Sequence, residues 1–141
     1  MGELVSVLCG MPASAIEAVR RLEDASLQYE QAGIVTEHSF HSGMYARTIK
    51  IPAGVLLTGV LIKIPTMLVF SGDAVVYTAT GPEQWTGYRV VLAPAHRKQA
   101  FLAHEDTYLT MVFPTTATTV EEAEAEFTDE AERLLSRRQE D

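Results

Sequence analysis

The stretch VLLTGVLIKIPTMLVFSG, residues 55–72, decides the fold of this chain. It is almost entirely apolar, but Lys63 and Pro65 interrupt it near the middle. A membrane-spanning helix needs about 20 largely uncharged residues. A buried helix does not suit an internal proline among so many β-branched side chains. The stretch therefore predicts two short buried strands, at about 55–63 and 66–71, and no membrane span.

Turn sequences stand on both sides of this stretch. The residues before it read Ile51-Pro52-Ala53-Gly54, in which proline presets one backbone angle and glycine permits a positive φ. The residues at its end, Ser71-Gly72-Asp73, have the composition of a second turn. We therefore expect the chain to reverse at both places.

The same punctuation continues through the middle of the chain. Further strand-like segments lie between prolines, glycines and acidic pairs: Tyr45–Ile51, Ala74–Thr80, Trp85–Ala93, Lys98–His104 and Thr107–Pro114. Glu105-Asp106 separates the last two and predicts a tight hairpin turn. About seven short strands at this spacing indicate an antiparallel sandwich or barrel.

A helix is predicted on the N-terminal side of the strands, at about residues 14–30. Pro12 and Ser14, with Glu17 three residues after the serine, are typical of a helix start. Gly33 is a suitable end.

A second, acidic helix is predicted at about residues 119–136. Thr119 and Glu122 form a capping-box pattern at its start. Apolar residues then recur at steps of three and four: Val120, Ala123, Phe127, Ala131 and Leu134. This apolar stripe either packs on its own domain or contacts another protein chain.

Length and composition indicate one globular domain over residues 1–141, with 47% hydrophobic and 21% charged residues. The single Cys9 excludes an internal disulfide framework and a cysteine-rich zinc site. The N-terminal residues include Glu3 where a secretory signal needs basic residues. A cytoplasmic protein is therefore the expectation.

Negative charge is concentrated at the C-terminal end. Residues 121–141 hold nine acidic and three basic side chains, whereas the net charge of the whole chain is −8. Arg97-Lys98 is the only local basic cluster within the strand region. Because nucleic-acid binding needs a concentrated basic surface, no nucleic-acid partner is expected.

Two segments resemble small cupin-domain proteins found mainly in phage genomes. They are TEHSFHSGMYARTIKIPAGVLLTG (36–59) and HEDTYLTMVFPT (104–115), and the likeness covers most of residues 14–127. It implies a cupin-type antiparallel jelly roll or β-sandwich, with an all-β core at about 36–115 and a helix at each end. The residue patterns alone indicate an antiparallel β domain without choosing this topology.

The resemblance also implies where a metal would lie. Cupins resemble one another in having a metal site inside the barrel, built from two or three histidines and a glutamate. In the phage-type relatives the strand after the Ile-Pro-Ala-Gly turn reads Gly-Lys-Ile-His-Lys, with another histidine four residues on. These histidines fall on Ile62 and Thr66, and a third, in the last strand, falls on Phe113. The general motif Pro-x-Gly-x-x-His appears here as Pro94-Ala95-His96-Arg97-Lys98-Gln99, so its ligand position is Gln99.

These four replacements remove the ligands of a transition metal. Isoleucine and phenylalanine do not ligate, threonine is a poor neutral donor, and glutamine is weak without anionic companions. We therefore expect no metal and no other cofactor, and an interior in which the replaced positions pack as core.

Two other sets of residues are candidates for a site. Polar side chains expected near the barrel mouth, where a small ligand would bind, are Lys63, Thr66, Tyr77 and Gln99. His38, His41 and His96 are candidates for a metal site at a different place, although their spacing does not specifically indicate one. Surface histidines are the alternative interpretation.

Three functions follow from these alternatives. The sequence favours a non-catalytic structural or accessory protein of phage or prophage origin. Its partners would be a second copy of the chain, most simply in a dimer, and other phage structural proteins. It would lie in the host cytoplasm or in the virion. The alternatives are a metal-dependent cupin enzyme of isomerase or dioxygenase type with a shifted site, and a metal-free cupin that binds a small ligand.

Overall fold

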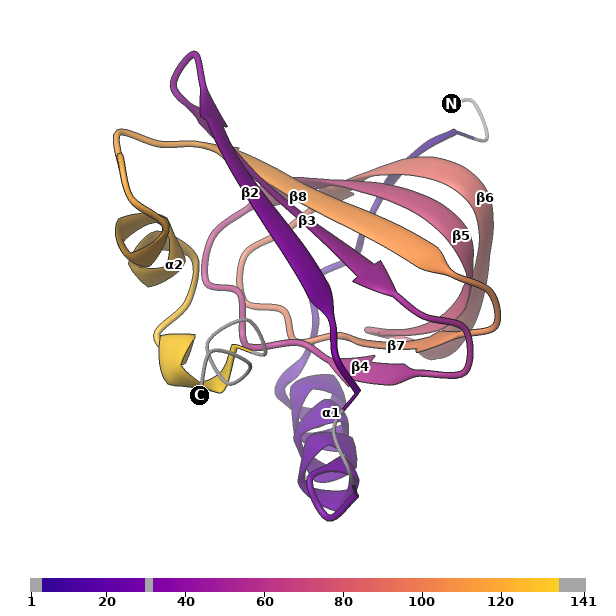
Figure 1. Cartoon of the computed structure of the whole chain (residues 1–141). Helices are drawn as coiled ribbons and strands as arrows, with labels where there is room; N and C mark the ends of the chain where they lie inside the picture. The colour runs from indigo at the N-terminus through magenta and orange to yellow at the C-terminus, as the bar shows by residue number, and fades with distance from the viewer. Residues whose placement is uncertain (1–3, 30–31, 135–141) are drawn as a thin grey trace.

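Eight strands and two α-helices make up the described residues, 4–29 and 32–134, of this computed structural model. The strands are β1 (Val5–Val7), β2 (Val35–His41), β3 (Met44–Ile51), β4 (Leu56–Thr58), β5 (Thr66–Thr78), β6 (Gly81–Ala93), β7 (Ala100–Ala103) and β8 (Thr107–Pro114). The helices are α1 (Ala13–Ser26), α2 (Val120–Phe127) and the short 3-10 helix η1 (Ala131–Arg133). Figure 1 shows α1 beneath β4 and α2 to the left of the barrel.

The strands form one curved sheet that closes around an interior. Their order is β1-β6-β5-β8-β3-β2, and the small pair β4–β7 joins through β7 and β5. Every pairing is antiparallel except that of β1 with β6. β5 pairs with β6 over its whole length, and on its other side with β8 first and then with β7. The predicted antiparallel jelly roll with a helix at each end is confirmed.

The apolar stretch at residues 55–72 contains β4 and the first half of β5. The predicted first strand, 55–63, is too long, because β4 ends at Thr58. The chain then bends so that Ile62 and Arg97 exchange two backbone hydrogen bonds, of 2.8 and 3.1 Å. The turn before the stretch is confirmed, since Gly54 has a φ of 83°.

The turn predicted at Ser71-Gly72-Asp73 is wrong, because β5 runs straight through these residues. Gly72 lies where the partner of β5 changes from β8 to β7. A Cβ atom on Gly72 would meet Thr107 Cα at 2.8 Å, and the backbone N–H of Asp73 donates to Thr107 Oγ1 (3.3 Å). The glycine therefore allows β5 to pass close to Thr107 at the start of β8, and it does not reverse the chain.

The tight hairpin predicted at Glu105-Asp106 is also wrong. These residues connect β7 to β8, but the two strands do not pair with each other: β7 pairs with β4 and β5, and β8 pairs with β3 and β5. Asp106 Oδ1 instead accepts a hydrogen bond from the backbone N–H of Ala53 (2.9 Å). That bond holds the connection against the turn that precedes β4.

Both helices are shorter than predicted. α1 ends at Ser26, well before Gly33, and its N-cap is Pro12 with no side-chain cap. The described part of the predicted range 119–136 holds α2 and η1, separated by residues 128–130, of which Thr128 is extended. The capping box of α2 is confirmed, because the Glu122 N–H donates to Thr119 Oγ1 (3.2 Å). Residue 30 and residues 135–136 lie outside the described residues.

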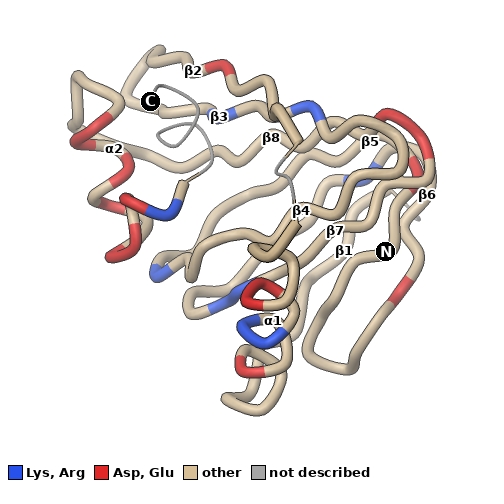
Figure 2. Tube along the Cα trace, turned by 60° about the horizontal axis from the view of Figure 1, so that its bottom comes forward, with Lys and Arg blue, Asp and Glu red and all other residues tan. Residues whose placement is uncertain are grey.

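The apolar stripe of the C-terminal region packs on the barrel of its own chain. Ala123, Phe127 and Leu134 are buried within the same core as the strands. Figure 2 shows acidic residues gathered on the other parts of α2. Within the described residues, no helix is both long enough and apolar enough to cross a membrane.

Candidate ligand-binding cavity

The interior of the barrel contains a cavity of about 120 Å³. Its walls are mainly apolar side chains that the strands turn inward, such as Leu57, Leu68 and Leu109. Phe127 and Leu134, from the C-terminal region, complete the walls. Phe113 is buried in the core and Ile62 packs against it, yet the barrel keeps a space about as large as a small organic molecule beside them.

Arg97 brings a positive charge into this interior. The residue lies in the connection between β6 and β7, is 1% exposed and contributes to the cavity wall. Its guanidinium group donates to the carbonyl oxygen of Pro94 (2.7 Å), to that of Ile64 (3.3 Å) and to Thr66 Oγ1 (2.5 Å). A fourth, weak contact reaches Met111 Sδ at 3.8 Å. All four acceptors are neutral.

No carboxylate pairs with Arg97 among the residues that the structure describes. Burial accordingly lowers the pKa of Arg97 to about 10. The side chain remains protonated at neutral pH, so the wall of the cavity carries a full positive charge without a nearby negative one.

Two buried polar atoms at the cavity have no hydrogen-bond partner in the described structure. They are Nε2 of Gln99, the residue directly before β7, and Oγ1 of Thr36 on β2. Both residues line the cavity, and Gln99 is 6% exposed. Native interiors rarely leave such atoms unsatisfied, so each one calls for an explanation.

The other cations of the cavity wall are neutralised by carboxylates. Arg47 on β3 forms an ion pair with Glu124 of α2 at 3.2 Å, and its guanidinium carbon lies 5.7 Å from the centre of the Phe127 ring. Arg133 of η1 forms an ion pair with Glu23 of α1 at 2.9 Å. These pairs fix the C-terminal region to the barrel and to α1.

A buried ion network lies beside the cavity and supports its C-terminal wall. Lys98, which is fully buried, donates to Glu23 at 3.1 Å and to the carbonyl oxygen of Gly59 at 2.8 Å. It also lies 3.7 Å from Glu130, which pairs with Arg20 at 2.9 Å. The network therefore joins α1, the connection before β7 and the residues around η1.

The predicted ligand-binding residues are not all brought together. Gln99 lines the cavity, and Thr66 is held behind it by Arg97. Lys63 does not line it and forms an ion pair with Asp129 at 2.6 Å. Tyr77 lies on β5 beyond the cavity, at a position between the inward-facing Val76 and Thr78.

The positions implied for a metal do not fit one. Ile62 and Gln99 line the cavity, whereas Phe113 packs against Tyr45 and Phe127, with ring centres 5.3 and 6.0 Å apart. The residues supply no anionic ligand, and the unpaired charge of Arg97 repels a divalent cation.

The histidines do not assemble a replacement site. His38 Nδ1 is hydrogen-bonded to the Tyr45 hydroxyl at 2.7 Å, and His41 and His96 are exposed. Over residues 4–29 and 32–134, no three histidine, cysteine or acidic side chains lie close enough together to hold a metal ion.

Sequence reasoning missed Arg97 as a cavity residue and treated Arg97-Lys98 as a basic cluster. Nothing in the local pattern separates these two cations from exposed ones, because their burial depends on α1 and on strands distant in the chain. The proline at position 94 was the only local signal, since it marks the end of β6 and the bend that turns Arg97 inward.

Comparison with known proteins supports the fold alone. No protein-family model and no curated protein matches the chain. Among solved structures, ectoine synthase from P. lautus is similar with a TM-score of 0.52 and 17% identity, over 70% of this chain and 76% of that one. KdgF from Halomonas sp. has a TM-score of 0.50 and 19% identity, over 64% and 87% of the two chains. A cupin superfamily protein from Desulfitobacterium hafniense has a TM-score of 0.50 and 12% identity, over 62% and 82%. The architecture is therefore that of the cupin jelly roll.

Proposed function

We propose that this chain is a metal-free cupin that binds a small molecule inside its barrel. The observation that supports this proposal is an apolar cavity that holds two buried polar atoms without described partners, Gln99 Nε2 and Thr36 Oγ1. A buried donor without an acceptor costs about 1–3 kcal/mol. A ligand that accepts from Gln99 and fills the apolar space removes that cost.

The chemistry of the wall supports binding over metal-dependent catalysis. The described residues offer no ligand set for a metal, and the cavity wall carries guanidinium groups instead of carboxylates and imidazoles. We expect the protein, purified without chelator, to contain far less than one Fe, Mn, Ni or Zn per chain by elemental analysis. A stoichiometric metal after dialysis would contradict this and favour the enzyme alternative.

Fragment binding tests the proposed function. Molecules of up to about six non-hydrogen atoms match the cavity volume, and ligand-observed NMR with thermal unfolding detects their binding. The variant Val60→Phe, which fills the cavity from its wall, is expected to abolish binding. Leu92→Phe, on the outer face of β6, is the matched control and keeps it.

If Val60→Phe does not fold, Gln99→Leu takes its place as the variant that loses binding. If no fragment binds to the wild-type protein, the cavity holds only solvent and the proposal fails.

A structural or accessory role remains a second candidate because of one surface. The outer apolar face consists of Val7, Met44, Met67 and Leu92, which are exposed around a shallow groove of about 460 Å³. Such a face is typical of contact with another protein surface. The phage or prophage origin inferred by resemblance would make a virion component the simplest partner. Mass spectrometry of purified particles from the source phage tests this role, and absence of the chain from them would count against it.

A further inference from the structure

We infer that the ligand of this cavity is a short organic carboxylate, held by Arg97 at its charged end and by Gln99 and Thr36 beside it. This inference rests on the proposed function and specifies its ligand. It follows from the charge of the wall, from the hydrogen-bonding groups left unused, and from the size of the cavity.

The charge of the wall is unbalanced at one place only within the described residues. Arg47 and Lys98 each have a carboxylate partner, at 3.2 Å and 3.1 Å. Arg97 is as deeply buried as these residues, but its acceptors are two carbonyl oxygens, a hydroxyl and a sulfur atom. A buried charge is costly unless it is paired, and the other cations of this interior follow that rule. An anion in the cavity would give Arg97 a negatively charged partner, as the other buried cations already have.

The place for the anion lies on the side of Arg97 that faces Met111. The Nη2–Sδ contact of 3.8 Å is the weakest of the four contacts, because thioether sulfur is a poor acceptor. Met111 also lines the cavity. A carboxylate oxygen there would replace a weak neutral acceptor with a charged one, which makes a shorter and stronger hydrogen bond.

The unsatisfied polar atoms in the same cavity wall as Arg97 are suited to a ligand that carries oxygen atoms. Gln99 Nε2 is a donor, and Thr36 Oγ1 both donates and accepts. Together with Arg97 they provide three groups that can donate to an anion or to an oxygen atom near it. A neutral ligand would satisfy Gln99 and Thr36 but would leave the charge of Arg97 unpaired.

Volume and wall chemistry limit the rest of the ligand. The cavity of about 120 Å³ is slightly smaller than an engineered cavity of about 150 Å³ that accepts benzene. The other cations of the wall, Arg47 and Arg133, already have carboxylate partners, and the rest of the wall is mainly apolar. The ligand is therefore a monocarboxylate with a short apolar portion, and inorganic phosphate or sulfate would leave the apolar wall uncovered.

A paired panel of probes tests the inference by isothermal titration at constant ionic strength. Acetate, propionate and butyrate are each compared with the amide of the same carbon skeleton, and inorganic phosphate is the purely anionic probe. We expect at least one carboxylate to bind about tenfold or more tightly than its amide, because a charge-assisted hydrogen bond is worth at least that factor. Phosphate is expected to bind more weakly than that carboxylate.

Arg97→Gln is expected to reduce carboxylate affinity to that of the amide while leaving the affinity for the amide within a factor of about two. Arg21→Gln, which makes the same change of charge on the exposed side of α1, is the matched control and leaves both affinities unchanged. If Arg97→Gln does not fold, Arg97→Lys replaces it, and the preference for carboxylate over amide is expected to survive in weakened form.

The outcomes separate the inference from the proposed function. Amides that bind as tightly as their acids overturn the carboxylate inference and leave the ligand-binding function standing. An undiminished carboxylate preference in Arg97→Gln also overturns it, because the charge partner would lie elsewhere. Absence of binding by every acid and every amide overturns both.

Discussion

Gln99 and Arg97 each place a polar group in the wall of a cavity that is otherwise mainly apolar. The neighbouring position Ile62, where the resemblance implies a metal ligand, carries a hydrocarbon side chain in the wall of the same cavity. Ile62 offers no atom that can hold a metal, whereas Gln99 and Arg97 offer hydrogen-bond donors. The cavity wall is therefore suited to recognising a polar molecule.

Gln99→Leu is expected to stabilise the ligand-free protein by about 1–2 kcal/mol, because it replaces an unsatisfied buried amide with an apolar group of similar volume. Urea denaturation measures the change. Gln84→Leu, at an exposed position of β6, is the control and is expected to change stability by less than about 0.5 kcal/mol. A loss of stability in Gln99→Leu would show that the amide has a partner in the folded protein.

Among the elements, β5 is the central strand of the sheet, because it pairs with three other strands, β6, β7 and β8. Its change of partner from β8 to β7 requires close approach of Thr107, which is fully buried. Gly72 makes that approach possible, since any Cβ there would overlap the backbone of Thr107. The position of one glycine thus determines where the sheet folds over to enclose the cavity.

Gly72→Ala is expected to destabilise the protein by about 2–4 kcal/mol, because its Cβ would overlap Thr107 Oγ1 and lie 2.8 Å from Thr107 Cα. Gly87 faces Gly72 across β5 and β6, has a φ of 75° and has open space around it. Gly87→Ala is therefore the matched control, with only the cost of a positive φ, about 1–2 kcal/mol. Equal losses in the two variants, measured by chemical denaturation, would contradict the steric explanation.

The segment between α2 and η1 is a second element on which the cavity depends. The backbone N–H of Leu61 donates to Glu130 Oε2 (3.2 Å), and Thr128 Oγ1 donates to the carbonyl oxygen of Leu61 (2.7 Å). Burial alone would raise the pKa of Glu130, but the Leu61 hydrogen bond and the nearby Arg20 and Lys98 lower it overall. The ionised form of Glu130 is therefore the one that holds this segment in place.

The sign of this pKa shift predicts a loss of stability in acid. A carboxyl group with a lowered pKa in the folded state contributes fully above its unfolded-state value of 4.5, and that contribution is lost as the pH falls through the lowered value. The difference in unfolding free energy between the wild type and Glu130→Gln is expected to be largest at about pH 7 and to shrink towards about pH 3. Glu121→Gln, on the exposed side of α2, should show little difference at either pH. A difference in unfolding free energy that stays constant with pH would contradict the proposed role of the Glu130 charge.

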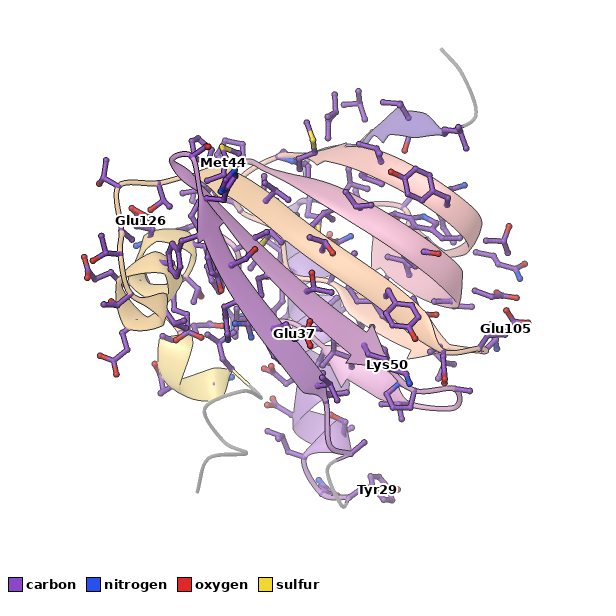
Figure 3. All side chains as sticks on the ribbon, turned by 45° about the horizontal axis from the view of Figure 1, so that its top comes forward. Tyr29, Glu37, Met44, Lys50, Glu105 and Glu126 are labelled. Carbon is purple, nitrogen blue, oxygen red and sulfur yellow. The ribbon has the colours of Figure 1, made fainter. Side chains whose placement is uncertain are left out.

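At the scale of the whole molecule, the outer apolar face is the surface suited to association. Val7, Leu92 and Met67 are neighbours across β1, β6 and β5, so that the face is continuous over three strands. Figure 3 views the molecule from this side, with Met44 at one end of β3 and Lys50 at the other. The C-terminal apolar stripe is already buried on the barrel, and only the N-terminal strand lies at this face.

We propose that two copies pair through the outer apolar face, since closed two-fold pairing is the commonest assembly of a single chain. Light scattering at micromolar concentration is expected to give the mass of a dimer. Met67→Lys is expected to give a monomer, because it places a charge within the apolar contact. Leu27→Lys, at an exposed residue just after α1, is the control and should remain dimeric. A monomeric wild type would refute the pairing.

Much of the strand region was predictable because its signals are local. Proline and glycine restrict or free their own backbone angles, so the turn at Gly54 and the end of β6 before Pro94 could be read from adjacent residues. The capping box of Thr119 and Glu122 is equally local, because both partners lie within one turn of α2. The resemblance supplied the jelly-roll topology, which local signals do not specify.

The cavity was decided by tertiary structure. Gly72 has the composition of a turn, but its role depends on Thr107, 35 positions later in the sequence. Arg97 and Lys98 are adjacent cations, yet one faces neutral acceptors and the other meets Glu23 of α1. The second helix ends at an extended Thr128, whose hydroxyl donates to the distant Leu61 carbonyl oxygen and accepts from the Glu130 N–H. The sequence by itself determined where strands, turns and caps begin, because those depend on neighbouring residues. Only the packing of distant segments decided which charges are buried, because burial and pairing are properties of the closed barrel.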